Sequence, residues 1–295
     1  TALMMLVDEG KVNVDDPVEK YLSEFKDQKV KVEQPGQPAE LVKPKHPILV
    51  RNILSHTSGL PFKSTIEQPT LDQGSLADRV RSYAAEPLLF EPDSKYQYSN
   101  EGINTAGRII EVVSGMPYEE FLDKRLFGPL GMKDTTFWPN AEQIARIAKP
   151  YKPTGDNAGL EETDVDQLKY PLDDKTRQPM PAGGLFSTAS DVARFCQMIL
   201  NNGQFEGRRY LSKAAVKQMT HKQTGDLKDN YGFGWSTGHG HAGHGGAFAT
   251  DMSIDRKNDL VLVYLIQHKG FPGNGKDARG AFENAARGAF AKPEK

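Results

Sequence analysis

Hydrophobic residues recur at helical spacing through most of the first 200 residues of the chain. The clearest case is 103–113, where apolar side chains repeat every three or four positions up to Ser114-Gly115, a typical helix end. Ser75 and Thr188, each followed three residues later by aspartate, predict the starts of two more helices. The same spacing predicts further helices over 1–9, 48–54, 117–127, 212–219 and 276–290.

The end of the chain changes to the pattern of an antiparallel sheet. We expect strands over 231–237, 247–255 and 260–267, and the short turn at 255–259 makes the last two antiparallel. Helices in the middle and a meander at the end predict an α+β fold, with helices packed on an antiparallel sheet.

Two irregular stretches interrupt these elements. Residues 26–46 are polar and read as a connection with some strand character at 29–32. Residues 139–182 are rich in Pro, Gly, Asp and Lys and show no clear period. Because so long an irregular stretch in a compact domain is usually functional, we expect 139–182 to form a wall or lid of a cleft.

The composition is that of an ordinary globular protein. The chain is 37% hydrophobic and 26% charged, with a formal net charge of −2 and both signs interspersed. This argues against nucleic acid as a partner, and the longest apolar runs, such as 260–266, are too short for a membrane span. The length fits one large domain or two closely packed ones, and it leaves the oligomeric state open.

Cys196 is the only cysteine, so no internal disulfide can form. It lies in the apolar stretch 192–198, which indicates a small buried side chain. One cysteine is compatible with export, and a periplasmic or secreted bacterial protein is the expectation, with the compartment otherwise open.

The tripeptide Tyr98-Ser99-Asn100 carries the most specific chemistry. A tyrosine and an asparagine two apart, in extended backbone just before a helix, point to the same side. The phenol can exchange a proton and the amide can hold a carbonyl or an ammonium, which suits acyl transfer by a serine enzyme. The alternative is structural: Tyr98 packs and Asn100 caps the following helix.

The tripeptide belongs to an ordered set of short motifs. These are a helix with its exit at Gly10-Lys11, the turn His56-Thr57-Ser58-Gly59-Leu60, Tyr98-Ser99-Asn100 followed by Gly102, Asn104, Gly107 and Ile110, Pro129-Leu130-Gly131-Met132, Ala182-Gly183-Gly184-Leu185 and His244-Gly245-Gly246. In this order they resemble the serine β-lactamase-related family, which includes class C β-lactamases, D-alanyl-D-alanine carboxypeptidases and family VIII carboxylesterases. The resemblance covers essentially the whole chain.

The resemblance implies a β-lactamase/transpeptidase-like fold, in which an antiparallel sheet flanked by helices adjoins a helical lobe. We expect a single domain over 1–295, with the helical lobe at about 48–200 and the sheet lobe formed by 1–47 and 201–295. The cleft between the lobes would hold the active site.

The resemblance also implies roles for individual residues. Tyr98 would shuttle the proton between nucleophile and leaving group, and Asn100 would position the catalytic lysine and the substrate carbonyl. His244, Gly245 and Gly246 would replace the Lys-Thr-Gly motif of class C enzymes and open a strand beside the cleft. The Ala247 N–H would complete an oxyanion hole, a device worth roughly 3–4 kcal/mol in acyl transfer.

The chain departs from the family at the Ser-x-x-Lys motif, whose serine is acylated. We expect this motif just upstream of Thr1, so that the domain is N-terminally incomplete, lacks the first strands of the sheet and is inactive by itself. Ser23 fits the letters, since Lys26 lies three residues later, but it follows the helix exit in a polar segment and is not expected to act.

The expected activity of the intact protein is serine-dependent hydrolysis of ester or amide bonds, in peptides or lactams, through an acyl-enzyme and without a cofactor. A histidine at 244 in place of the lysine and threonine weakens the grip on a β-lactam carboxylate, which favours esterase-like activity on a small-molecule substrate.

Three alternatives remain open. His239, His241 and His244 match a His-x-His-x-x-His zinc spacing, although a glycine-rich hairpin loop also explains them. Thr1 would be an N-terminal nucleophile only at the start of a strand, and it adjoins a helix. A protein without the nucleophile would be a binding protein or scaffold.

The turn 56–59 places His56 and Ser58 too close together to act as a catalytic pair, so it is interpreted as a capped turn.

Overall fold

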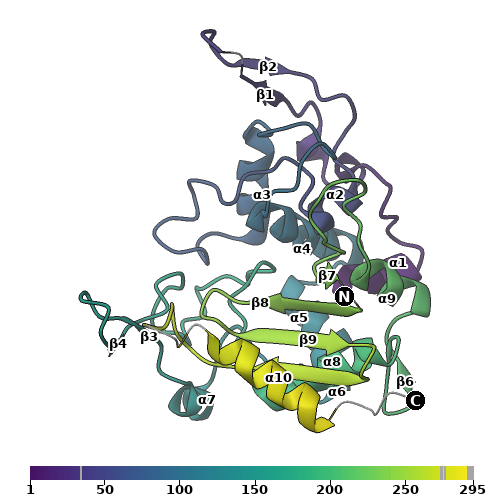
Figure 1. Ribbon diagram of the computed structural model, residues 1–295. Helices are drawn as coiled ribbons and strands as arrows, with labels where there is room; N and C mark the ends of the chain where they lie inside the picture. Colours follow the sequence, from purple (N-terminus) through teal and green to yellow (C-terminus); the bar gives the residue numbers. More distant parts are fainter. Residues whose placement is uncertain (34, 239, 273–274, 276, 291–295) are drawn as a thin grey trace.

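The computed structural model describes residues 1–33, 35–238, 240–272, 275 and 277–290. One half of the molecule is built on a four-stranded antiparallel sheet in the order β10-β9-β8-β7. Its strands are β7 (Ser236–Gly238), β8 (His241–Gly245), β9 (Asp251–Asp255) and β10 (Leu260–Tyr264). Helix α8 (Ala189–Leu200) packs against β9 and β10, and α10 (Ala278–Phe290) crosses the opposite face of the sheet (Figure 1). The α+β prediction is therefore confirmed.

The other half of the molecule is helical and is organised around α4 (Asn100–Ser114). This helix contacts four others, which are α1 (Ala2–Asp8), α2 (Val50–Ser55), α3 (Leu76–Ala85) and α5 (Tyr118–Leu122). Its Ile109 is fully buried in a core that reaches from Leu6 in α1 to Ile254 in the sheet. A single cluster of buried residues includes side chains of α1, α4, α8 and the sheet, so the two halves share one continuous hydrophobic core.

Helix starts and ends follow the capping residues that the sequence predicts. The hydroxyls of Ser75 and Thr188 accept the N–H groups of Asp78 and Asp191. Ser212 starts α9 (Lys213–Thr220) in the same way. Gly115 ends α4 with φ of 71°, a conformation that favours glycine. After α5 the helix continues through a wider turn at Asp123–Phe127 into α6 (Gly128–Leu130).

The predicted strands at the end of the chain are partly wrong. Of 231–237, only the last residues pair, because Gly234 adopts a positive φ of 77° and turns the chain so that Tyr231 bridges back to Ser236. The expected strand 247–255 begins only at Asp251, since residues 246–249 form a turn closed by the Ala249 N–H to the Gly246 carbonyl at 3.0 Å. Strand β8 was not predicted, because its glycines and histidines lack the alternation of apolar residues that marks a strand.

The irregular stretches carry small hairpins. Strands β1 (Val30–Val32) and β2 (Glu40–Val42) form an antiparallel pair that projects from the helical half (Figure 1). Residues 139–182, called here the wall segment, contain α7 (Ala141–Arg146), β3 (Tyr151–Pro153) and β4 (Leu160–Glu162). A further pair, β5 (Gln204–Phe205) and β6 (Arg208–Arg209), follows α8. None of the described helices has the length and hydrophobicity of a transmembrane span.

Candidate active site

A cavity of about 1170 Å³ lies between the helical half and the sheet. Its lining includes Tyr98, Asn100 and the run 244–247, which are the six residues singled out from the sequence. Thr1 and Ala2, at the first turn of α1, and many residues of the wall segment line it as well. The expectation that 139–182 forms a wall of the cleft is thus confirmed.

The backbone at Ser99 explains why Tyr98 and Asn100 both face the cavity. Ser99 is extended, with φ of −139° and ψ of 119°, and its hydroxyl accepts the Gly102 N–H at 3.1 Å. Ser99 is therefore the cap of α4, and the structural alternative that Asn100 is the cap is wrong. The Asn100 N–H donates to the Phe62 carbonyl at 3.1 Å, which fixes the first turn of the helix beside the cavity.

Tyr98 is half-buried, and burial raises the pKa of its phenol above the ordinary value of 10.0. The phenol is therefore neutral at pH 7 and can donate a proton. To accept one in its ionised form, it would need a nearby positive charge to lower its pKa.

His244 lies near the end of β8, on the opposite side of the cavity. Its Nδ1 lies 2.7 Å from the Gly245 carbonyl, which can only accept, so this nitrogen carries the hydrogen. In the neutral ring Nε2 is then an acceptor for the Tyr231 hydroxyl, 2.9 Å away. The prediction that this motif opens a strand is wrong, because it closes β8 and leads into a turn.

The turn after β8 leaves little space at its glycine. A Cβ on Gly246 would lie 2.2 Å from the Thr250 hydroxyl oxygen, so a side chain there would force the Thr250 side chain to move. The Gly246 N–H donates to the Thr250 carbonyl at 2.7 Å, and Ala247 follows at the tip, lining the cavity.

The histidines of the zinc alternative do not converge where the structure describes them. His241 and His244 are three apart on β8, so their side chains leave opposite faces of the sheet. His241 lies 3.6 Å from Asp255, whereas His244 binds Tyr231. His239 lies outside the described residues, and among the described ones no group of three His, Cys, Asp or Glu side chains is placed to hold a metal ion.

Other candidate nucleophiles are placed away from this chemistry. Cys196 is fully buried beside the Met252 sulfur at 3.7 Å, and burial raises the pKa of its thiol to about 12. Ser23 starts a short 3-10 helix (Ser23–Phe25) and is not among the described residues that line the cavity. Thr1 precedes a helix, as expected, and not a strand.

The sequence did not indicate the cluster of rings below the cavity. The His56 ring packs against the Tyr98 ring at a tilt of 35°, with centroids 4.2 Å apart, and its centroid lies 4.7 Å from that of the Tyr231 ring. Burial, followed by the neighbouring Tyr98 and Tyr96, raises the pKa of Tyr231. The only indication of this ring cluster in the sequence was the aromatic and glycine-rich run 231–235. That run does not show which rings contact one another in the fold.

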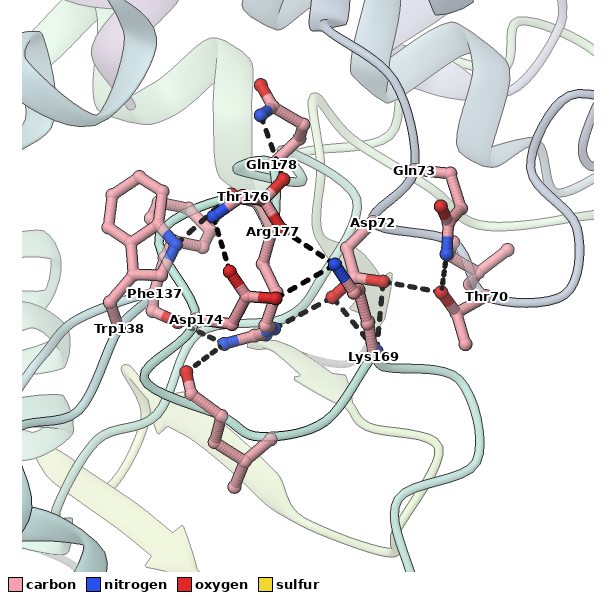
Figure 2. A network of polar contacts seen from close by, with 12 residues as sticks. Thr70, Asp72, Gln73, Phe137, Trp138, Lys169, Asp174, Thr176, Arg177 and Gln178 are labelled. Atoms are coloured by element: carbon pink, nitrogen blue, oxygen red, sulfur yellow. Dashed lines mark hydrogen bonds and ion pairs between the residues drawn. The ribbon is translucent and has the colours of Figure 1, made fainter.

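A buried ion pair fixes the wall segment to the loop before α3. The Arg177 Nε donates to Asp72 at 2.8 Å, and both side chains are almost completely buried (Figure 2). The Lys169 N–H reaches both carboxylate oxygens of Asp72, at 3.0 and 3.1 Å, and the Thr70 hydroxyl donates at 2.7 Å. Asp72 is thus surrounded by donors, which is the condition for keeping a buried carboxylate charged.

Arg177 also donates from Nη1 to two backbone carbonyls, one within the wall segment and one just before it. It donates to the carbonyls of Phe137 at 2.7 Å and Leu172 at 2.5 Å, while the Trp138 indole N–H donates to the Arg177 carbonyl at 3.1 Å (Figure 2). Above this network a small apolar cluster, which includes Leu71, Leu168 and Met180, faces the cavity. The polar network therefore positions the apolar lining of the cavity.

Helix α4 holds the far end of the wall segment. The Asn104 side chain accepts the Ala182 N–H at 3.1 Å. One turn later, a Cβ on Gly107 would lie 2.2 Å from Pro181, so only glycine permits this close approach. Arg79 of α3 adds a hydrogen bond to the Pro179 carbonyl at 2.6 Å.

Comparison with known proteins gives a consistent result. Residues 1–286 match the family model described as Beta-lactamase. An uncharacterized protein of Mycobacterium tuberculosis is 31% identical over 307 residues, which cover 90% of this chain and 74% of that protein. A Salmonella agona protein with the provisional name D-alanyl-D-alanine carboxypeptidase is 28% identical over 294 residues, which cover 90% of this chain and 65% of its own.

Solved structures share the fold. Simvastatin synthase (LovD) from Aspergillus terreus superposes with a TM-score of 0.79 at 19% identity, covering 99% of this chain and 82% of its own. EstCE1, a hydrolase with promiscuous acyltransferase activity, gives a TM-score of 0.73 at 21% identity, covering 96% of this chain and 79% of its own. At these identities the likeness shows the fold alone.

Proposed function

The chain belongs to the beta-lactamase family, and from that premise we propose that it forms the main part of a serine hydrolase that cleaves ester or amide bonds through an acyl-enzyme, with esters favoured. The observation that carries the proposal is the convergence on one cavity of Tyr98, Asn100, the run 244–247 and the first turn of α1. The names of two similar proteins, a hydrolase with acyltransferase activity and a carboxypeptidase, are in line with this chemistry.

The position of α1 supports the expected origin of the nucleophile. Thr1 and Ala2 line the cavity, so residues that precede Thr1 in a longer protein would extend the first turn of α1 beside Tyr98. A Ser-x-x-Lys pair there would bring its serine to the reacting centre and its ammonium to the Tyr98 phenol. Since burial raises the pKa of that phenol, the ammonium is what would let Tyr98 accept the proton of the serine.

His244 supports the preference for esters. Both of its ring nitrogens are engaged within the protein, by the Gly245 carbonyl and the Tyr231 hydroxyl. The ring therefore has no free nitrogen to offer a substrate carboxylate, which a carboxylate-bearing lactam would require. The apolar lining of the cavity, for example Phe62 and Phe248, fits an uncharged acyl or alkoxy group better.

The test uses the natural protein at its full length, with any residues that precede Thr1. A serine-directed fluorophosphonate should add one covalent group, read by intact mass, and p-nitrophenyl esters should be hydrolysed faster than a chromogenic cephalosporin. Tyr98→Phe should lower kcat by roughly 10²–10⁴, the usual contribution of a positioned acid–base group. Tyr96→Phe, in the same ring cluster, is the matched control and should stay within a few-fold.

The absence of an adduct, together with unchanged hydrolysis in Tyr98→Phe, would exclude the serine mechanism. A natural sequence without a serine at the expected position would instead make the cavity a binding site.

A further inference from the structure

The turn after α2 holds the chain on both sides of Tyr98. His56 ends α2 in a left-handed conformation, with φ of 59° and ψ of 35°. Its carbonyl accepts the Gln97 N–H at 2.9 Å, and its Nδ1 accepts the Ser99 N–H at 3.1 Å. One residue therefore binds the two neighbours of Tyr98 in the sequence.

The same imidazole also packs against the phenol ring of Tyr98. The ring planes of His56 and Tyr98 are inclined by 35°, with centroids 4.2 Å apart. The His56 ring also contacts the ring of Tyr231, whose hydroxyl binds His244. His56 therefore lies between Tyr98 and the residue that binds His244.

The hydrogen bonds define the state of the ring. Because Nδ1 accepts an N–H, it carries no hydrogen, and the neutral ring has its hydrogen on Nε2. Nε2 is buried and has no hydrogen-bond partner among the described residues. Burial, followed by the nearby His244, lowers the pKa of His56 to about 3, so the ring stays neutral.

A buried donor without a partner costs stability, and a carbon ring of similar shape would avoid that cost. An asparagine would also serve the left-handed turn, since asparagine tolerates this conformation well. Ring packing alone and the left-handed turn alone do not explain why a histidine stands at this position. A histidine is explained by the two features together, a ring that packs against Tyr98 and an acceptor directed at the Ser99 N–H.

We propose that His56 is a positioning residue of the active site, which holds the Tyr98 phenol at the reacting centre by accepting the Ser99 N–H and packing against the phenol ring. The inference rests on the proposed function, because it is there that Tyr98 carries the proton. The bond to Ser99 is the main contribution, since it fixes the backbone between Tyr98 and Asn100.

Two variants separate the bond from the ring packing. His56→Asn keeps the left-handed turn and places Oδ1 where Nδ1 lies, but it removes the ring. His56→Phe keeps a ring and removes the acceptor. The control is His221→Asn, because His221 is an exposed histidine at the end of α9 and does not line the cavity.

We expect His56→Phe to lower kcat for a p-nitrophenyl ester by about 100-fold, with KM changed less than threefold, since misplacement of about 1 Å costs this much. His56→Asn should restore kcat to within about tenfold of the unchanged protein. A second readout needs no turnover: the Tyr98 ring resonance in ¹³C-tyrosine NMR, assigned with Tyr98→Phe, should move in His56→Phe and stay near its original position in His56→Asn.

A folded His56→Phe with the original kcat and Tyr98 resonance would overturn the proposal. So would a His56→Asn as impaired as Tyr98→Phe, and this second criterion holds even if His56→Phe does not fold. If the natural protein at its full length hydrolyses nothing, the proposed function fails, while the NMR comparison still decides whether His56 positions Tyr98.

Discussion

The two sides of the cavity bury ionisable groups in opposite ways. On the wall side, Asp72 and Arg177 are buried as an ion pair, and the carboxylate is surrounded by donors. On the Tyr98 side, Glu101 follows Asn100 directly and is fully buried, and neither of its carboxylate oxygens has a hydrogen-bond partner among the described residues. Burial, then the charges of Glu86 and Glu67, raises the pKa of Glu101 to about 9.

The difference shows how each side keeps its shape. The wall side depends on charges that are present and paired, whereas the Tyr98 side depends on Glu101 and His56 remaining uncharged. The wall should therefore respond to loss of a charge, and the Tyr98 side to a change of pH.

The largest effect is expected from Asp72→Asn. It leaves the Arg177 guanidinium buried without its counter-charge, which should lower the free energy of unfolding by about 3–5 kcal/mol. Urea denaturation measures it. The matched control is Asp78→Asn, which removes an exposed carboxylate paired with Arg81 and should cost at most about 1 kcal/mol. Equal losses in the two variants would remove the distinction between the buried pair and a surface pair.

A smaller loss is expected where the wall segment meets α4. Gly107→Ala puts a methyl group within 2.2 Å of Pro181, and overpacking of this kind costs about 1–3 kcal/mol. Gly280→Ala is the control, because Gly280 lies in the exposed helix α10 with no atom within 4 Å of a new Cβ. A thermal melt that places both variants at the original midpoint would contradict the close contact.

Glu101→Gln sharpens the comparison on the alkaline side. The folded protein binds the Glu101 proton more tightly than the unfolded chain, since the pKa rises from 4.5 to about 9. Stability from this group is complete below pH 4.5 and is lost as pH rises toward 9, by at most about 1.4 kcal/mol per pH unit. The variant should lack this decline. Parallel stability curves for both proteins between pH 5 and 9 would show that Glu101 is ionised in the folded state.

His56→Asn tests the acid side and has the smallest effect near neutrality. The pKa of His56 falls from 6.5 to about 3 in the folded protein, so stability from the neutral ring is complete above pH 6.5 and is lost as pH falls toward 3. The variant should lose this acid dependence, measured by urea denaturation between pH 4 and 7. An unchanged slope would assign the acid lability to other groups.

Local rules recovered the parts of this molecule that depend on neighbours in sequence. The caps at Ser75 and Thr188, the helix that starts at Ser212 and the α+β class were predicted because side-chain hydrogen bonds and periodicity act within a few residues. Strand β8 was missed because pairing, and not its composition, makes it a strand.

The candidate site was predicted only in part for the same reason. The resemblance pointed to Tyr98, Asn100 and the run from His244, all of which line one cavity. The Asp72–Arg177 pair joins residues that are 105 positions apart in the sequence, and the His56 imidazole binds Ser99, which is 43 positions away. No spacing in the sequence encodes such contacts, which follow from how α2, α3 and α4 pack.

Helix α4 acts as a common reference for the dimensions of the cavity. Its first turn carries Asn100, its second binds Ala182 through Asn104, and its third touches Pro181 at Gly107. Helix α4 therefore fixes the position of the Tyr98 side of the cavity relative to the wall side. Engineering for a wider substrate should therefore change wall-segment residues that line the cavity, such as Leu168 or Met180, because any change within α4 would move the chemistry and the wall together.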